Sequence, residues 1–342
     1  MTAAAETSPL EARVGHHYQM DGTYLVGREK LREYARAVQD YHPAHWDVAA
    51  ATKLGYPDLV APLTFTSAPG MQCNRRMFEE IVVGYDTYLQ TEEVFEAHRP
   101  IVAGDELVID VELTSVRRTA GRDFITVTNT FTDSAGERVH TLHTTVVGVT
   151  ADDIDAGVKT AVQKAMMHDM NILDIGGADA DYVKTLRPAG QIRIADGSAR
   201  TPGTPRFEDV TAGQDLGVHH TRLSRGDLVN YAGVAGDANP IHWDEAIAKL
   251  AGLPDVIAHG MLTMGLGAGF ASTWTGDPGA ATRYAVRLSQ PAVVSAAEGA
   301  DIEYSGKVKS LDPETRTGVL LVGAKSAGKK IFGLATLTVR FR

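Results

Sequence analysis

The feature of this sequence that most constrains its fold is an internal repeat with a spacing of 197 residues. Adding 197 to residue numbers 28 to 67 leads, without a gap, to a second segment of similar sequence. At the centre of the repeat, QDYHPAHWDVA at residues 39–49 is matched by GDANPIHWDEA at residues 236–246. Solenoid repeats are much shorter, roughly 20 to 50 residues. The spacing therefore predicts two tandem copies of one whole domain.

The composition agrees with two folded domains. The chain has 342 residues, of which 44% are hydrophobic and 22% charged, a balance typical of globular proteins. A net charge of −10 disfavours nucleic acid as a partner. The single cysteine, Cys73, cannot form an intramolecular disulfide, which fits a reducing compartment. Because no signal peptide or bilayer-spanning apolar run is recognisable, we expect a cytoplasmic protein without membrane insertion.

The domain boundaries are expected around a segment of different character. We predict an N-terminal domain at residues 1–150, a connector at 151–205 and a C-terminal domain at 206–342. The connector begins with apolar residues at helical spacing and ends in SARTPGTPR, whose Pro and Gly content is typical of an exposed linker.

The order of predicted elements is the same in both copies. A short helix precedes the polar cluster, an apolar segment follows it, and alternating strands come last, for example at residues 107–113 and 125–131. In the second copy the apolar segment, HGMLTMGLGAGFASTW, is apolar on nearly every side, which is typical of a helix buried all round. Antiparallel strands can bury such a helix only by wrapping around it. We therefore predict the α+β class and a tandem (double) hot-dog fold.

The polar cluster of the second copy contains an acid and an imidazole. The Asn-Pro pair forces a turn, which can bring Asp237 and His242 to the same side of a pocket. A carboxylate and an imidazole placed in this way can handle two protons in one reaction. In the alternative interpretation, Asp237 only caps a helix and His242 packs at its end.

A glycine eighteen residues after His242 adds to the catalytic interpretation. Gly260 is expected to open the buried helix, where backbone N–H groups are unpaired and the helix dipole is positive. Such a helix terminus can stabilise the oxygen of a thioester carbonyl as it gains negative charge. The combination predicts proton removal next to a carbonyl, coupled to loss or addition of water.

The patterns GDANPIHWDEAIA and IAHGMLTMG resemble the MaoC-like family of R-specific hydratases and dehydratases. The greatest similarity is to the (3R)-hydroxyacyl-acyl carrier protein dehydratases of type II fatty acid synthesis, including mycolic acid elongation, which pair a substrate-binding A subunit with a catalytic B subunit. The second copy resembles the B subunit. The first copy resembles the A subunit through VGREKLREYA, LGYPDLVAPLTF and RPIVAGD. The resemblance implies a fused A–B pseudo-dimer.

The resemblance also implies a role for each residue of the second copy. Asp237 and His242 would be catalytic, Asn239 would support them by hydrogen bonding, and the Gly260 N–H would anchor the carbonyl. The substrate would be carried by an acyl carrier protein or by coenzyme A, with other fatty acid synthesis enzymes as possible partners and without a metal or other cofactor. An R-specific enoyl-CoA hydratase of fatty acid or sterol side-chain degradation and a non-catalytic acyl-binding module are the alternatives.

The first copy departs from the pattern. It keeps Asp40 and His45, but Gln39 and His42 replace the glycine and the asparagine, and Pro62-Leu63 replaces His259-Gly260. A helix beginning at Pro62 is expected to break at Pro69-Gly70 and to leave a void for the acyl chain. Three roles remain open for this copy: acyl binding, a second active site at Asp40 and His45, or a purely structural half. In the first of these, the substrate channel would be formed by Pro62, Leu63, Pro69 and Gly70.

Overall fold

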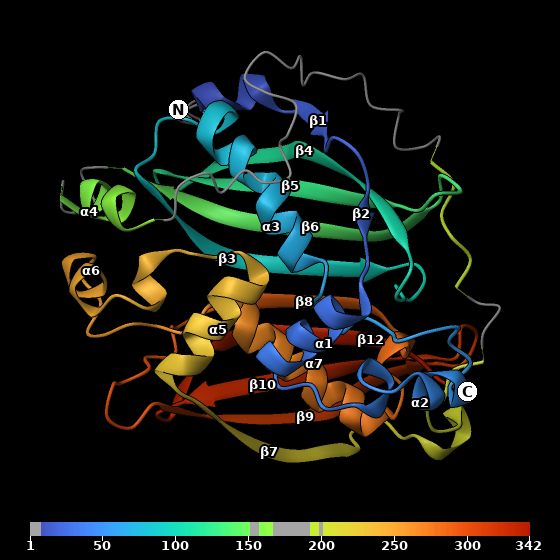
Figure 1. Ribbon diagram of the computed structural model, residues 1–342. Coiled ribbons are helices and arrows are strands. Elements are labelled where there is room, and N and C mark those ends of the chain that lie inside the picture. Colours follow the sequence, from blue (N-terminus) through green and yellow to red (C-terminus); the bar gives the residue numbers. More distant parts are fainter. Residues whose placement is uncertain (1–7, 151–156, 167–191, 198–200) are drawn as a thin grey trace, which may run out of the picture.

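The computed structural model describes residues 8–150, 157–166, 192–197 and 201–342 of the chain. Much of the predicted connector lies outside these described residues; what is described of it includes helix α4 (Gly157–Ala165). In Figure 1 the main strands of the first repeat lie above those of the second repeat in one continuous antiparallel sheet, whereas helices α1 and α2 of the first repeat lie in the lower half, near α5 and α7.

The first half contains the elements from η1 to β6. Its short helices, α-helices and strands are η1 (Pro9–Arg13), β1 (His17–Gln19), β2 (Tyr24–Leu25), α1 (Arg28–Ala37), η2 (Pro43–His45), α2 (Val48–Lys53), α3 (Ser67–Arg76), the π-helical turn η3 (Met77–Ile81), β3 (Thr87–Ala97), β4 (Glu106–Thr119), β5 (Arg122–Thr132) and β6 (Arg138–Val149).

The second half repeats this order. Its elements are η5 (Phe207–Asp209), β7 (Asp215–Leu223), α5 (Arg225–Ala235), η6 (Pro240–His242), α6 (Glu245–Leu250), α7 (Gly260–Thr275), η7 (Pro278–Ala280), β8 (Ala281–Leu288), β9 (Ala300–Asp312), β10 (Thr317–Ser326), β11 (Lys329–Lys330) and β12 (Phe332–Arg340).

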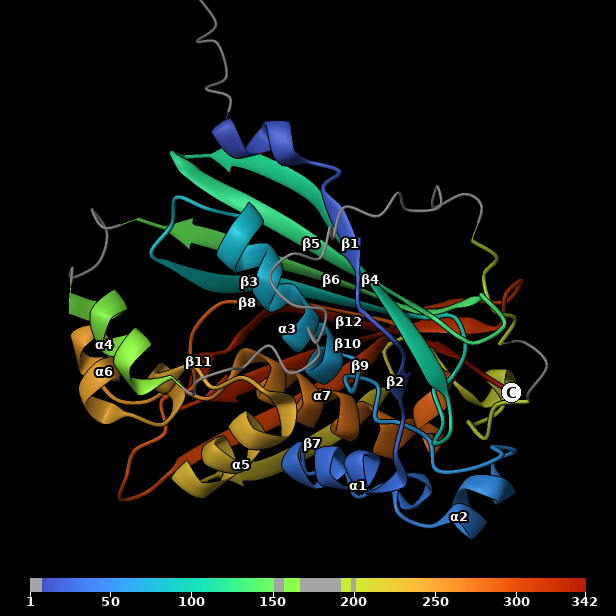
Figure 2. The same ribbon diagram turned by 45° about the horizontal axis from the view of Figure 1, so that its top comes forward.

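The strands form one 12-stranded antiparallel sheet that continues through both halves. Its order is β1-β4-β5-β6-β3-β8-β12-β10-β9-β7, with β2 beside β4 and β11 beside β10. Strands of the first half and their counterparts in the second half therefore follow the same order from the two edges, as expected for two copies related by a pseudo-two-fold axis. Figure 2 shows α1, α3, α5 and α7 on one side of this sheet. The predicted double hot-dog fold is confirmed.

The two halves join through the pairing of β3 with β8. Phe95 lies opposite Tyr284 in this ladder. Next to them, Arg287 pairs with Glu92, with Nε 3.2 Å from Oε1. The buried apolar side chains of both halves form one connected cluster. Because backbone pairing and apolar core both cross the junction, we expect the halves to unfold together.

Helix α7 has the position and character that the sequence predicted. It begins at Gly260, and most of its residues are buried. Its glycines permit close packing: a Cβ on Gly265 would lie 2.5 Å from Val38 Cγ1, and one on Gly267 would lie 2.9 Å from the Tyr284 hydroxyl. Among the helices of the described residues, none has both the length and the hydropathy needed to cross a membrane.

The prediction that Pro69-Gly70 breaks the central helix of the first half is wrong. Helix α3 includes both residues and continues as η3 to Ile81. Pro69 is the third residue of α3, where a backbone N–H has no acceptor within the helix, so the ring removes no hydrogen bond. The difference between the halves lies at the start of the helix. By the 197-residue spacing Gly260 corresponds to Leu63, and α3 begins four residues later, at Ser67.

Candidate active site

The turn that carries Asp237 is held by local backbone interactions. Helix α5 ends at Gly236, which adopts a left-handed conformation with φ 80° that glycine accepts without strain. The Asn239 side chain accepts a hydrogen bond from the Ile241 N–H at 3.3 Å and so caps η6. The Asn239 backbone N–H donates to Asp237 Oδ1, also at 3.3 Å. Asn239 thus shapes the turn through its side chain and contacts the carboxylate through its backbone.

The turn brings Asp237 and His242 together. Asp237 Oδ2 lies 3.9 Å from His242 Nε2. On the other side of the ring, His242 Nδ1 lies 2.8 Å from the Ile257 carbonyl oxygen. Because a carbonyl can only accept, this contact places the proton of the neutral ring on Nδ1. Nε2 is then free to take a proton from a bound molecule.

The surroundings favour the neutral form of His242. Burial lowers the pKa of His242, although Asp237 and the Ile257 carbonyl oppose the shift. The His242 side chain is 9% exposed and that of Asp237 is 20% exposed. The pair is therefore open on the carboxylate side, from which a substrate can approach.

His259 also belongs to this site, although the sequence analysis gave it no role. Its ring stacks on that of His242 with centroids 3.8 Å apart and planes at 28°. His259 Nε2 lies 3.3 Å from the Asp237 carbonyl oxygen. Burial lowers the pKa of His259 to about 3, so the ring is neutral and supports His242 without adding charge. The replacement of His259-Gly260 by Pro62-Leu63 in the first half was the sequence feature from which a role for His259 could have been inferred.

Gly260 directly follows His259 and adjoins this site from the helix side. Helix α7 starts here, and no side chain caps its amino terminus. A Cβ on Gly260 would lie 2.6 Å from Leu288 Cδ1 and 2.9 Å from Gln90 Oε1. Gln90 comes from β3, so the first half contributes a wall to the site of the second half. The Leu288 and Gln90 side chains can pack closely against this backbone because residue 260 has no side chain.

The cluster of Asp237, His242 and His259 offers three potential metal ligands within 4.8 Å of one another. The two stacked rings are nearly parallel, so their in-plane lone pairs do not converge on one point. A tetrahedral zinc site needs converging ligands. The geometry is better suited to proton transfer than to holding a metal.

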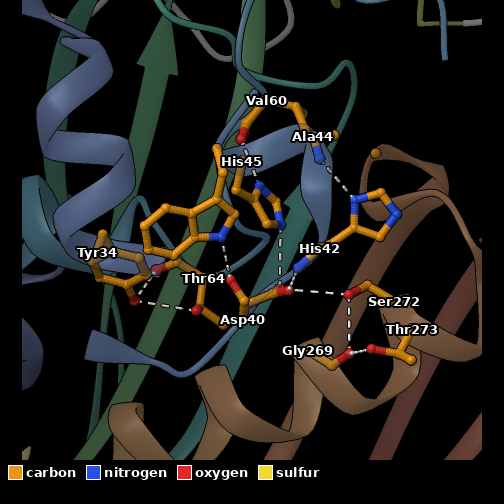
Figure 3. A network of polar contacts seen from close by, with 12 residues as sticks. Tyr34, Asp40, His42, Ala44, His45, Val60, Thr64, Gly269, Ser272 and Thr273 are labelled. Atoms are coloured by element: carbon orange, nitrogen blue, oxygen red, sulfur yellow. Dashed lines mark hydrogen bonds and ion pairs between the residues drawn. The ribbon is translucent and has the colours of Figure 1, made fainter. Parts of the chain in front are cut away.

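The first half contains a second pair with the same arrangement, shown in Figure 3. Asp40 Oδ2 lies 3.3 Å from His45 Nε2, and His45 Nδ1 lies 2.7 Å from the Val60 carbonyl oxygen. That carbonyl is fifteen residues beyond the histidine, as in the second half. The structure therefore brings Asp40 and His45 together in the same way as Asp237 and His242.

The pair of the first half is more enclosed and differs in charge. Asp40 is 4% exposed and His45 is fully buried. Burial opposes both charges, but the attraction between the two groups outweighs it, lowering the pKa of Asp40 and raising that of His45. The His42 ring, which replaces the asparagine, lies 3.1 Å from the Gly276 carbonyl oxygen at the end of α7. The pair is thus held as a buried ion pair.

Each pair lies against the central helix of the other half. A Cβ on Gly269 of α7 would lie 3.3 Å from Asp40 Cγ, and a Cβ on Gly236 would lie 3.1 Å from Gln72 Nε2 of α3. Gln72 and Gly269 are themselves related by the 197-residue spacing. Both sites are therefore built at the interface between the halves.

The residues predicted to form a substrate channel separate into two groups. Pro62 and Leu63 line a pocket of about 340 Å³, mouth included, between the halves. Pro69 is buried inside α3. Gly70 packs against β5 and β6, where a Cβ would lie 3.1 Å from Leu142 Cδ2. Pro62 and Leu63 are thus at a cavity, whereas Pro69 and Gly70 lie in the packed part of the helix.

A double hot-dog fold with an Asp–His pair beside an uncapped helix is the arrangement expected of the hydratase and dehydratase class. A MaoC-like domain matches residues 208–324, and a FAS1-like dehydratase domain region matches residues 12–142. A MaoC-like dehydratase of known structure is 77% identical with a TM-score of 0.92, over 97% of this chain and 100% of that chain. The chain belongs to the MaoC-like dehydratase family.

Two further proteins are similar to parts or all of the chain. A UPF0336 protein of Mycobacterium tuberculosis (strain ATCC 25618 / H37Rv) is 38% identical over 159 residues, which are 44% of this chain and 96% of that protein. A conserved hypothetical protein of Mycobacterium tuberculosis with a double hotdog fold is 15% identical with a TM-score of 0.63, over 96% of both chains. The second likeness concerns the fold alone.

Proposed function

We propose that this protein is a (3R)-hydroxyacyl-thioester dehydratase, which converts a (3R)-3-hydroxyacyl thioester into a trans-2-enoyl thioester and water. The observation that carries the proposal is the Asp237–His242 pair beside the uncapped amino terminus of α7. Dehydration next to a thioester requires removal of the C2 proton, protonation of the leaving C3 hydroxyl and stabilisation of the carbonyl oxygen. The site offers one group for each requirement.

His242 is the base in this mechanism. Its neutral ring presents Nε2 to the substrate because Nδ1 is committed to the Ile257 carbonyl. Nε2 takes the C2 proton, and the C2–H electron pair forms the C2=C3 double bond as the C3–O bond breaks. Asp237 receives this proton from Nε2 and delivers it to the C3 hydroxyl, which leaves as water, so the Asp237–His242 pair returns to its starting state. The 3.9 Å separation leaves room for the hydroxyl oxygen to contact both groups. Each such group contributes roughly 10² to 10⁴ in rate.

The amino terminus of α7 is the proposed carbonyl site. The free N–H groups of its first turn and the positive end of the helix dipole favour the negative charge that the oxygen gains. Gly260 is the first residue of this helix, and its N–H is the proposed anchor of the carbonyl oxygen. The thioester itself acidifies C2, so the mechanism requires no cofactor.

We further propose that the physiological substrate is carried by an acyl carrier protein in chain elongation. The resemblance of the two halves to the A and B subunits of the acyl carrier protein dehydratases supports this assignment. Hydration of enoyl-CoA in degradation uses the same residues in the reverse direction. Comparing one acyl chain on coenzyme A and on acyl carrier protein separates the two assignments, because elongation predicts the higher kcat/KM on the carrier protein.

The proposed reaction is tested by its product. Purified protein mixed with a trans-2-enoyl thioester should convert it to the 3-hydroxyacyl thioester, with loss of the conjugated enoyl absorbance. Chiral analysis should find the (3R) product. Formation of the (3S) product, or no reaction on either carrier, would contradict the proposal.

A further inference from the structure

Strand β3 of the first half carries a bulge beside the site of the second half. In the ladder with β6, Gln90 and Glu92 lie opposite consecutive residues, so Thr91 is an extra residue. Side chains alternate along a regular strand, and residues three apart therefore point to opposite faces. The extra residue changes this alternation. As a result Gln90 and Glu93 lie on the same face and contact each other.

The side-chain amide of Gln90 contacts the first two residues of α7. Gln90 Nε2 lies 3.3 Å from Met261 Sδ. A Cβ on Gly260 would lie 2.9 Å from Gln90 Oε1, so this oxygen packs directly against the Gly260 backbone. Gly260 and Met261 begin α7, whose amino terminus has no side-chain cap. A residue of the first half therefore supports the helix terminus that carries the proposed carbonyl site.

Glu93 holds the Gln90 amide in this position. Gln90 Nε2 donates a hydrogen bond to Glu93 Oε2 at 2.6 Å, and the Thr144 hydroxyl of β6 donates to Glu93 Oε1 at 2.8 Å. The Glu93 side chain is fully buried. Because both of its oxygens accept hydrogen bonds and it has no access to solvent, the carboxyl keeps one orientation. That orientation in turn fixes the Gln90 side chain.

The Glu93 carboxyl is also largely uncharged at pH 7. Burial raises the pKa of Glu93 to about 8. A carboxylate one side chain away from the amino terminus of α7 would offset the positive end of the helix dipole, which the proposed mechanism uses to stabilise the carbonyl oxygen. A neutral Glu93 holds Gln90 without this competition. Buried acids with strongly shifted pKa values are concentrated at functional sites.

We propose that Gln90 and Glu93 are positioning residues of the active site, which hold the first turn of α7 in the geometry that binds the thioester carbonyl. The role rests on the proposed function, whereas the contacts described above are independent of it. Gln90 acts through the Gly260 backbone, and Glu93 acts through Gln90. The catalytic half therefore depends on the first half for the geometry of its carbonyl site.

The geometry of the carbonyl site can be measured from the absorbance of a bound conjugated thioester. The probe is trans,trans-2,4-hexadienoyl-CoA, bound to full-length Asp237→Asn so that turnover is slow. Hydrogen bonds to the carbonyl oxygen draw electrons through the conjugated system and shift its absorbance to longer wavelength. Adding Gln90→Met keeps the length of the side chain but removes the amide, and should reduce this shift by at least about half.

The kinetic test uses chains in which Asp237 is unchanged. Gln90→Met and Glu93→Leu should each lower kcat for trans-2-decenoyl-CoA hydration roughly 10-fold and change KM less than about 3-fold, because a misplaced anchor mainly loses transition-state stabilisation. Glu93→Gln keeps an oxygen that accepts from Gln90 and should retain most of the rate. The matched control is Glu92→Gln on the opposite face of β3, which should leave kcat and the absorbance shift unchanged.

Hydrogen exchange in α7 tests the contact without a substrate. The Thr263 N–H donates to the His259 carbonyl at 3.2 Å and closes the first turn of the helix. Its exchange should be at least about 10-fold faster in Gln90→Met and in Glu93→Leu, and unchanged in Glu92→Gln. Because Gln90 is only partly buried, we expect Gln90→Met to fold even where Glu93→Leu does not.

The outcomes separate this proposal from the proposed function. Wild-type exchange, kcat and absorbance shift in Gln90→Met would overturn the positioning role and leave the proposed function intact. A wild-type protein that does not convert the enoyl thioester would contradict the proposed function. In that case the exchange rates alone would confirm or overturn the support of α7 by Gln90.

Discussion

Glu93 provides a quantitative test of how the two halves are joined. It is fully buried on β3, between β6 and β8. Its carboxyl accepts hydrogen bonds from the Thr144 hydroxyl at 2.8 Å and from Gln90 Nε2 at 2.6 Å. Burial raises the pKa of Glu93 from 4.5 to about 8 despite these bonds.

The raised pKa determines the sign of the pH dependence. The folded state binds the Glu93 proton more tightly than the unfolded state does. The stability that this proton binding contributes is complete below pH 4.5 and is lost as the pH rises toward about 8. One pKa unit corresponds to about 1.4 kcal/mol. The buried carboxyl therefore costs about 3 kcal/mol of unfolding free energy at pH 7 and about 5 kcal/mol above pH 8.

Glu93→Gln removes the charge and keeps the shape of the side chain. In urea unfolding, we expect the free energy of unfolding of the variant to be higher than that of the wild type. The difference should be less than about 1 kcal/mol at pH 5 and several kcal/mol at pH 8.5. The matched control is Glu92→Gln, whose side chain is 33% exposed beside Arg287; it should change stability by less than about 1 kcal/mol at every pH. A Glu93→Gln difference that does not grow with pH would refute the reasoning.

Three further predictions concern the site of the second half. Because burial lowers the pKa of His242, kcat/KM for decenoyl hydration should fall only below pH 6.5; a midpoint near pH 7.5 in the pH profile would be inconsistent with a neutral buried base. His259→Ala should lower kcat roughly 10-fold and move that acidic limb upward, because His242 loses a stacked neighbour and gains solvent; an unchanged profile would show that the stacking has no such role. Gly260→Ala should lower kcat/KM more than 10-fold with a change in urea stability below about 1 kcal/mol, since its Cβ would meet flexible side-chain ends; full activity would exclude this backbone as the carbonyl anchor.

The repeat made the fold predictable from the sequence. Tandem copies with a buried helix and alternating strands leave few ways to cover that helix, and the double hot-dog followed. The pairing of β3 with β8 could not be derived in the same way, because it depends on how the halves dock. The docking also determines which residues of one half line the site of the other, as Gln90 and Ser272 do.

The sequence was less informative where local rules depend on exact position. Pro69 breaks a helix in its interior but not at its third residue, and the sequence did not reveal that α3 starts at Ser67. His259 is evident in the sequence, but its role depends on stacking with His242, which is seventeen residues away in the sequence. The distance between Asp237 and His242 depended on the turn at Asn239-Pro240, which the sequence did predict.

The most direct test of the central claim is the rate of trans-2-decenoyl thioester hydration in Asp237→Asn and His242→Gln, measured beside the wild type by loss of the enoyl absorbance. Both substitutions are close in shape to the native side chains, and thermal unfolding shows whether each variant is folded. The proposed mechanism predicts that each folded variant loses at least 100-fold in kcat/KM, because both groups act on the same two protons. Wild-type rates in both variants would contradict it.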